Sequence, residues 1–417
     1  MSPLSLMTLA WRNLWRQKRR TFLTLISIAF GGFLAIMMTA MQDYTWLDFI
    51  DNAARLGAGH VTLQHVEYQD TPTLTRTVRD TTSLRAAAEA DPLVARVVDR
   101  TTGSVMLSTA RDSFGGFFIG FDPERENSDT MEFTDGLMAG KLFETASDDG
   151  IILGHILANN LGAELGDKIV FTATDRTGEI VSGMERLSGL LKTGAASTDA
   201  AIVLLPLDTV REVIGFGEAE STQVAIFLED GRNAAAVAER MATQLDPETT
   251  VLTWDVLQPE IKTFVAMKVG GGRVMIGIIG LLVAAGIFNT LFMSVLERTR
   301  EFGIMIALGY SPRQIFALVM FESGFLAVMG LIGTAAVSFM PYKALNENGI
   351  DISAQIEEAG ASMDIGGVGM DTVMPVGIFP ESVVAIAVLI VTATMVAGIY
   401  PAWRAGRVSP VNAINLV

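Results

Sequence analysis

Apolar residues gather along this chain in four long blocks rather than alternating with polar ones. The blocks cover residues 21–41, 274–296, 315–340 and 382–403, and a single charged residue, Glu322, lies within them. A helix needs about 20 mostly apolar residues to cross the hydrocarbon of a bilayer, whereas a helix at the surface of a globular core keeps one polar face. The pattern therefore predicts four membrane-spanning helices.

The first block could instead belong to a cleaved signal peptide, because basic residues precede it. Its apolar run exceeds the roughly 7 to 15 residues usual in such a segment, so we expect it to remain as the first spanning helix. Residues 1–20 predict an amphipathic helix at the membrane surface. Its apolar and basic residues lie on different sides: Leu4, Met7, Trp11, Leu14 and Trp15 against Arg12, Arg16 and Arg19.

Charge divides the segments between the blocks into two classes. Residues 1–20, 297–314 and 404–417 together carry ten Lys or Arg and two acidic residues, Glu297 and Glu301. Segment 42–273 carries 36 acidic and 19 basic residues, and segment 341–381 carries seven and one. Because Lys and Arg concentrate in cytoplasmic loops, we expect both termini and segment 297–314 inside, and both acidic segments outside.

Segment 42–273 is long enough for one or two compact subdomains. Alternation and composition predict strands at 60–65, 117–121, 151–153, 168–174, 200–205 and 223–228. Helices are predicted at 82–95, 158–165, 207–214 and 233–245. The fold class is therefore an α-helical membrane protein with four spanning helices and a large α+β domain outside the cytoplasm, between the first two.

Helical spacing continues past the membrane on both sides of this domain. Residues 44–56 and 256–268 predict helical stalks that connect the domain mechanically to the membrane. Gly270, Gly271 and Gly272 follow the second stalk, and three glycines disfavour a stiff helix. They form a candidate hinge; a loop break or a close helix contact is the alternative.

The chain offers few residues for chemistry. It has no cysteine and three histidines, His60, His65 and His155, without metal-ligand spacing. The Gly140–Lys141 step lacks the glycine pattern of a phosphate-binding loop. We therefore expect no catalytic residue, no metal site and no cofactor bound by this chain.

The segment between the second and third blocks reads NTLFMSVLERTREFGIMIALGYSPRQI, from Asn289 to Ile315. It closely resembles the FtsX-like permease family of ABC transporters, which includes MacB, LolC and LolE. The likeness extends over essentially the whole chain: the N-terminal helix, IILGHILANNLGAELGDKIVF at 151–171, Glu322, and the closing motif with Pro401, Ala402, Trp403, Arg404, Ala405, Pro410, Ala413 and Ile414. Segment 341–381 departs from the family, which usually has a shorter turn there.

The resemblance implies partners that supply the missing chemistry. Two copies of a separate cytoplasmic ATPase would bind ATP and Mg, and a second permease copy, identical or related, would complete the complex. Segment 297–314 would dock the ATPase through a short amphipathic helix presenting Glu301, Phe302, Met305 and Leu308 to a groove. Further residues of the motif set orientation or shape the turn: Glu297, Arg298, Arg300, Gly303 and Gly309. The alternative is a solvated basic loop.

Polar residues inside the apolar blocks need partners. We expect Glu322 to make a helix-packing hydrogen bond as the neutral acid, with coupling or proton transfer as the alternative. Asn289 would hydrogen-bond between helices. Glycines that permit close packing point, as the family implies, to a dimer interface on the first two helices: Gly31, Gly32, Gly277 and Gly280.

The resemblance further implies how such a permease works. Four helices leave little room for a channel, so the family suggests mechanotransmission from ATP hydrolysis to work in the periplasm of a bacterium, with the chain in the inner membrane. Lipoprotein or lipid transport toward the outer membrane is the expected function, with membrane lipids and a periplasmic carrier or adaptor as partners and no nucleic acid. MacB-like efflux of peptides or small molecules through a partnered duct, and FtsX-like control of an envelope hydrolase, are the alternatives.

Overall fold

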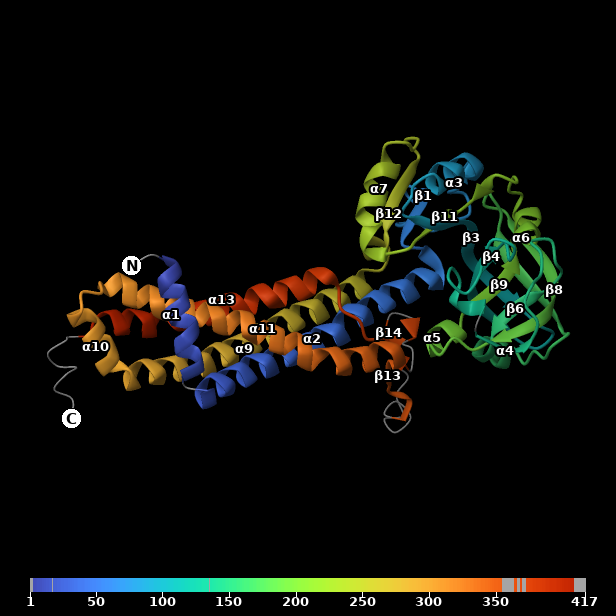
Figure 1. Cartoon of the computed structure of the whole chain (residues 1–417). Coiled ribbons are helices and arrows are strands. Elements are labelled where there is room, and N and C mark those ends of the chain that lie inside the picture. Colours follow the sequence, from blue (N-terminus) through green and yellow to red (C-terminus); the bar gives the residue numbers. More distant parts are fainter. Residues whose placement is uncertain are drawn as a thin grey trace. The chain divides into compact units, whose positions relative to one another are not determined.

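The computed structural model describes residues 3–16, 18–134, 136–354, 364–365, 368–369 and 373–408 (Figure 1). The chain forms two compact units. The helical unit combines residues 1–45, 267–351 and 373–417, and the α+β unit combines residues 46–266 and 352–372. Pro410, Ala413 and Ile414 of the closing motif lie outside the described residues, as does most of segment 355–372.

The helical unit is built from long apolar helices, each containing one of the apolar blocks. In the described part of the chain four helices are long and apolar enough to cross a membrane: α2 (Lys18–Ala53), α9 (Pro259–Glu297), α11 (Pro312–Asn348) and α13 (Pro380–Gly406). Two shorter helices, α1 (Pro3–Arg16) and α10 (Thr299–Ala307), lie at one end of this unit, where α1 runs across the long helices (Figure 1). We call this end the loop end.

Glycine brings the long helices into close contact. A Cβ atom added at Gly31 would fall 2.0 Å from Val283 Cγ2, and one at Gly32 would fall 2.3 Å from Thr334 Oγ1. Gly280 faces Leu389 less tightly, at 3.3 Å, and nothing lies within 4 Å of a Cβ at Gly277. Of the four glycines expected to permit close packing, two therefore do so tightly within this chain.

The C-terminal end of α11 differs from the sequence expectation. The third apolar block was expected to end at Met340, with a loop from Pro341, but α11 continues through Pro341 to Asn348. A proline removes one helix hydrogen bond, and here that loss falls where the apolar block ends. Two short strand pairs follow: β13 (Ile350–Asp351) with β16 (Val373–Met374), and β14 (Asp364–Ile365) with β15 (Val368–Gly369).

The α+β unit is organised around one long strand, β3 (Val94–Ser108). Its first half pairs with β11 (Gln223–Leu228), and its second half pairs with β4 (Ser113–Phe121) and, near its end, with β7 (Lys168–Thr174). In the described residues the sheet runs in the order β12-β1-β11-β3-β4-β9-β6-β8-β5, with β7 against β3 and β8. The other strands of this sheet are β1 (Val61–His65), β5 (Leu137–Gly140), β6 (Ile151–Gly154), β8 (Ile180–Leu191), β9 (Ile202–Pro206) and β12 (Thr249–Thr253).

Helices cover this sheet, and two of its apolar cores lie between helices and strands. One core lies around β1, β11, α3 and α7, and includes Val61, Val224 and Val237. The other lies around β3, β6, β7, α4 and α6, and includes Leu107, Leu153 and Phe171. The remaining elements are α3 (Thr81–Glu89), α4 (His155–Asn160), α5 (Ala196–Asp199), α6 (Leu207–Ile214), α7 (Ala234–Ala242), α8 (Trp254–Leu257) and a β10 (Glu220–Ser221) to β2 (Val78–Arg79) pair.

The two segments expected as stalks are helical and contact each other within the α+β unit. α2 runs on to Ala53 and α9 begins at Pro259, so each spanning helix extends beyond its apolar block. The rings of Phe49 and Phe264 lie 5.1 Å apart, and Gln258 Nε2 donates a hydrogen bond to the carbonyl oxygen of Ala53 at 3.3 Å. Both segments are therefore helical beyond the apolar blocks, and they pack against each other.

Candidate functional site

The motif between the second and third spanning helices folds as a short helix between two sharp turns. α10 starts after Arg298 and ends at Ala307, and Gly309 follows with a φ of +96°, a conformation that favours glycine. Ser311 then caps α11: its Oγ accepts a hydrogen bond from Gln314 N at 3.3 Å, while Gln314 Oε1 accepts one from Ser311 N at 2.8 Å. This capping box sets the direction in which α11 leaves the loop.

The two faces of α10 differ from the sequence expectation in one respect. Phe302 was expected on the presented face, yet it is fully buried in a core formed by α1, α9, α11 and α13. Met305 packs partly against the same core, because the apolar side of α10 is buried against the neighbouring helices. Leu308 and Ile304 are exposed, Leu308 to 75%. The surface offered outward is therefore Arg300, Ile304, Ala307, Leu308 and Gly309.

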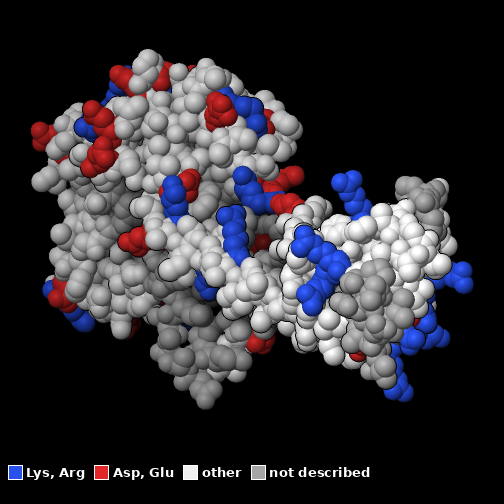
Figure 2. All heavy atoms as spheres, turned by 90° about the vertical axis from the view of Figure 1, so that its left-hand side faces the viewer, with Lys and Arg blue, Asp and Glu red and all other residues white. Residues whose placement is uncertain are grey.

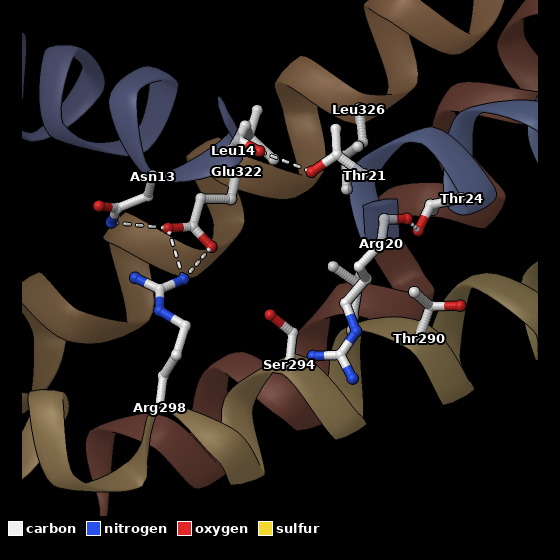
Figure 3. A pocket seen from close by; sticks show the side chains of 11 residues that line it. Asn13, Leu14, Arg20, Thr21, Thr24, Thr290, Ser294, Arg298, Glu322 and Leu326 are labelled. Atoms are coloured by element: carbon white, nitrogen blue, oxygen red, sulfur yellow. Dashed lines mark hydrogen bonds and ion pairs between the residues drawn. The ribbon is translucent and has the colours of Figure 1, made fainter. Parts of the chain in front are cut away.

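Arg298, at the start of α10, joins three helices (Figure 3). Its Nη1 donates to Glu322 Oε1 and Oε2 of α11 at 3.1 and 3.0 Å, and its Nε donates to Glu301 Oε2 at 3.3 Å. Glu322 Oε1 also accepts a hydrogen bond from Asn13 Nδ2 of α1 at 2.9 Å. The expectation for Glu322 was a packing hydrogen bond as the neutral acid; in the structure it accepts one from Asn13 and two from a guanidinium, that of Arg298. We call Asn13, Arg298 and Glu322 the latch.

Two further ion pairs tie the same segment to the start of the chain. Arg20 donates through Nη1 and Nη2 to both oxygens of Glu297, at 2.7 and 2.8 Å, and Arg16 Nη1 lies 2.9 Å from Glu301 Oε1. These pairs are partly exposed, so each contributes about 0–1 kcal/mol. In the latch Glu322 is buried and the Arg298 side chain is 11% exposed. Removing either of these two would cost about 3–5 kcal/mol, because the other charge would be left without its partner.

A small cavity lies beside the latch (Figure 3). Its volume is about 30 Å³, room for roughly one or two water molecules. Besides the latch and Arg20, the lining comprises four hydroxyl side chains and three leucines: Thr21, Thr24, Thr290, Ser294, Leu14, Leu291 and Leu326. The latch therefore lies next to a small space that is not filled by side chains.

The loop end is also the cationic end of the helical unit. Figure 2 looks at this end and shows blue side chains around the part nearest the viewer, with little red between them. The exposed cations described there come from α1, α2, α10, α11 and α13: Arg12, Arg16, Lys18, Arg19, Arg300, Arg313, Arg404 and Arg407. This gathering of cations at one end agrees with the charge pattern from which the topology was predicted.

The remaining candidate residues lie elsewhere. Asn289 is exposed on α9 and makes no hydrogen bond within the described part of the chain, so it does not join helices of one protomer. α9 runs unbroken through Gly270, Gly271 and Gly272, which rules out a loop break. A Cβ at Gly272 would meet Gln42 Oε1 at 1.8 Å, a close helix contact, whereas Gly270 and Gly271 have open space around them.

The sequence reasoning missed the contributions of Asn13, Arg16 and Arg20 to this site. Their partners, Glu322, Glu301 and Glu297, were all singled out. Charge complementarity between the N-terminal cations and the two glutamates of the loop was the available signal, since both segments were expected on one side of the membrane. Asn13 carried no such signal, because nothing in its spacing shows that α1 crosses α11.

Two families match this architecture. Residues 273–410 match the family described as FtsX-like permease C-terminal, and residues 21–244 match the MacB-like periplasmic core domain. The chain belongs to the FtsX-like permeases with a MacB-like periplasmic core domain. The resemblance noted from the sequence and the expected fold class are thereby confirmed.

This permease matches some relatives along their whole length and others along only part of it. The lipoprotein-releasing system transmembrane protein LolC of Xylella fastidiosa (strain 9a5c) is 24% identical over 436 residues, 99% of both chains. The pyoverdine export ATP-binding/permease protein PvdT of Pseudomonas putida (strain KT2440) is 24% identical over 425 residues, 97% of this chain and 59% of that protein. The solved periplasmic region of MacB from Actinobacillus actinomycetemcomitans matches with a TM-score of 0.36 and 15% identity, over 51% of this chain and 97% of that one.

The family settles the class of the protein. It is a membrane-spanning ABC transporter permease with a periplasmic core domain, and the family implies a cytoplasmic ATPase partner that binds ATP and Mg.

Proposed function

We propose that this permease works by mechanotransmission, carrying lipoproteins or lipids from the inner membrane toward the outer membrane. It would pair with two copies of the ATPase and with a second permease copy, and a periplasmic carrier would receive the cargo. LolC matches along 99% of its own length, whereas PvdT, which includes an ATP-binding part, is matched along 59%. The match along the whole length of LolC supports lipoprotein release rather than efflux as the function.

In this proposal the loop end faces the cytoplasm, with both termini on that side and the α+β unit in the periplasm. Its surplus of cations supports that orientation. A second permease copy would cover α9, because 11% of the most apolar part of this helix is buried, against 28–44% for the other three spanning helices. Asn289, exposed on α9, would find its hydrogen-bonding partner in that interface.

The observation that carries the proposal is the latch. It links α10, whose outer surface is exposed, to α1 and α11 through a buried carboxylate. A push on α10 by the closing ATPase would reach the spanning helices through side chains that resist separation, and α2 and α9 would pass it to the stalks. No transported molecule needs to enter the bundle in such a mechanism.

The docking step is tested by a charge placed on the exposed surface of α10. Leu308→Asp should remove the apolar contact with the ATPase groove, so that the ATPase no longer co-purifies with the inserted permease. Ile180→Asp is the matched control, because Ile180 is 78% exposed on β8 of the α+β unit. Co-purification is measured by quantitative blotting against permease in the same membrane fraction. Equal ATPase recovery with both variants would contradict docking through α10.

The cargo is tested with the assembled complex in proteoliposomes. A triacylated fluorescent lipoprotein should pass to an added soluble acceptor only with ATP, and a variant with impaired docking should lose that transfer. ATP-dependent release of a water-soluble peptide, with no transfer of the lipoprotein, would favour efflux. ATP hydrolysis that changes the activity of an envelope hydrolase while nothing moves would favour regulation.

A further inference from the structure

A surface hollow with an unusual charge lies at the junction of α1 and α2. Its volume is about 560 Å³, and its lining comprises four cations and one carboxylate: Arg16, Lys18, Arg19, Arg20 and Glu297. All five residues belong to the helical unit, so the hollow lies within one unit.

The cations of this hollow are only partly neutralised. Arg20 is engaged by both oxygens of Glu297, and Arg16 pairs with Glu301 of α10. Lys18 and Arg19 are exposed and form no ion pair with any described residue. Lys18 and Arg19 therefore have no counter-charge from the described chain. Arg16 and Arg20 have carboxylate partners, but each could also donate a hydrogen bond to a bound anion.

The hollow sits where lipid headgroups should lie. The uncharged run of α2 begins at Thr21, directly after Arg20. α1 crosses the long helices (Figure 1) and exposes four apolar side chains: Leu4, Met7, Trp11 and Trp15. Exposed tryptophans on a helix lying across a bundle are typical of the boundary between headgroups and acyl chains. At such a boundary the cations of the hollow would lie near the phosphate groups of the lipids.

We propose that this hollow binds the phosphate of an anionic phospholipid of the same leaflet. Lys18 and Arg19 would supply the uncompensated charge, Arg16 and Arg20 would donate hydrogen bonds to the phosphate oxygens, and an acyl chain would lie along the apolar residues of α1. A lipid is the occupant rather than free phosphate because Arg16 of the hollow is the last residue of α1, the helix that exposes Leu4, Met7, Trp11 and Trp15. The site does not depend on which molecule the transporter carries.

The test is a lipid titration of the purified permease–ATPase complex in detergent, read by native mass spectrometry. Dioleoyl phosphatidylglycerol should bind the wild type more tightly than dioleoyl phosphatidylcholine does. Lys18→Gln/Arg19→Gln should weaken phosphatidylglycerol binding about tenfold or more, since each juxtamembrane cation contributes appreciably to attraction of anionic lipid. The control is Arg313→Gln/Arg404→Gln, which removes two exposed cations from the same end of the helical unit and should change binding less than about twofold.

Two outcomes would overturn the proposal. Equal loss of phosphatidylglycerol binding in the two double variants would show that total charge, and not the hollow, attracts the lipid. Displacement of the lipid by inorganic phosphate at matched ionic strength would show a site for free anions. The ATPase recovered with each variant reports on assembly, so failure of this site is distinguishable from failure of docking.

Discussion

Each unit of this protein buries an arginine–glutamate pair, and the two pairs are built differently. In the α+β unit Arg100 uses Nε and Nη2 as a fork on the two oxygens of Glu126, at 2.7 and 2.9 Å, and both side chains are at most 1% exposed. In the helical unit Arg298 reaches both oxygens of Glu322 through Nη1 alone, and these side chains are 11% and 8% exposed.

The surroundings follow the same contrast. Arg100 also donates to the carbonyl oxygen of Thr130 at 2.7 Å and lies 5.4 Å from the centre of the Phe227 ring, so its position is fixed from several sides. Arg298 also has a second carboxylate, Glu301, and an aromatic ring, Phe302, at 5.1 Å, but it lies beside a cavity of about 30 Å³ and joins helices that the proposed mechanism must move. A fork of two nitrogens in a packed core holds one geometry, whereas a carboxylate held through one nitrogen beside a cavity can be released and bound again. The first pair is a structural lock, and the second is a latch.

The largest expected effect comes from breaking the lock. Arg100→Ala should destabilise the α+β unit by about 3–5 kcal/mol, because Glu126 would remain buried without its partner. The measurement is hydrogen exchange of the full chain in detergent, with protection lost along β3 and β11. Arg96→Ala removes a more exposed arginine of the same strand and is the control. Unchanged protection in the Arg100 variant would contradict the assignment of a lock.

Breaking the latch should have a different signature. Glu322→Ala should loosen α1 and α10, raise hydrogen exchange at both, and lower ATP-dependent transfer several-fold while the ATPase still co-purifies. The apolar replacement Arg298→Met/Glu322→Leu should recover much of the stability, as buried ion pairs often tolerate such exchange, but not the transfer. Arg100→Met/Glu126→Leu should leave transfer intact. Equal transfer by both double variants would remove the distinction between lock and latch.

A smaller effect concerns a neutral neighbour of the lock. Tyr68 is buried, and its hydroxyl donates to the carbonyl oxygen of Thr102 at 2.8 Å. Burial raises the pKa of the Tyr68 phenol above its usual 10.0, although hydrogen bonds with Thr102 and Thr222 oppose the shift. With the pKa raised in the folded state, the stabilisation by the neutral phenol is complete below pH 10 and is lost as the pH rises through the folded-state pKa.

Tyr68→Phe should therefore cost about 1 kcal/mol at neutral pH, the usual worth of one hydrogen bond, and should flatten the alkaline part of the profile. Protease resistance of the α+β unit in the full chain, followed from pH 8 to pH 11, measures both effects. Tyr68 is the single tyrosine between residues 46 and 266, so another phenol of that segment cannot produce the same alkaline change. A variant that lost resistance as steeply as the wild type would contradict the assignment.

Prediction from the sequence was more accurate in some regions than in others, for physical reasons. β7, β11 and α6 have the predicted bounds, because their patterns are local and their ends carry turn residues such as Gly215. β3 was missed, and the predicted helix 82–95 ran into it, since its pairing partners are remote in sequence. At the site, Arg298 and Glu322 were each singled out but not paired. Phe302 was predicted to face the ATPase, because a local sequence pattern does not reveal the helices against which α10 packs.

The smallest expected effect concerns the candidate hinge in α9, which would complement the latch. Gly270 and Gly271 have open surroundings, so alanine fits at both, and each change should stabilise α9 by about 0.5–1 kcal/mol. If the helix bends there during coupling, the double variant should hydrolyse ATP normally and transfer less cargo per ATP. Gly277→Ala is the control, because Gly277 is equally open but lies within the spanning part of the helix. Unchanged transfer in the double variant would contradict a hinge at these glycines, because a stiffer α9 would then transmit the motion equally well. The latch would remain as the site at which ATPase motion is coupled to the spanning helices.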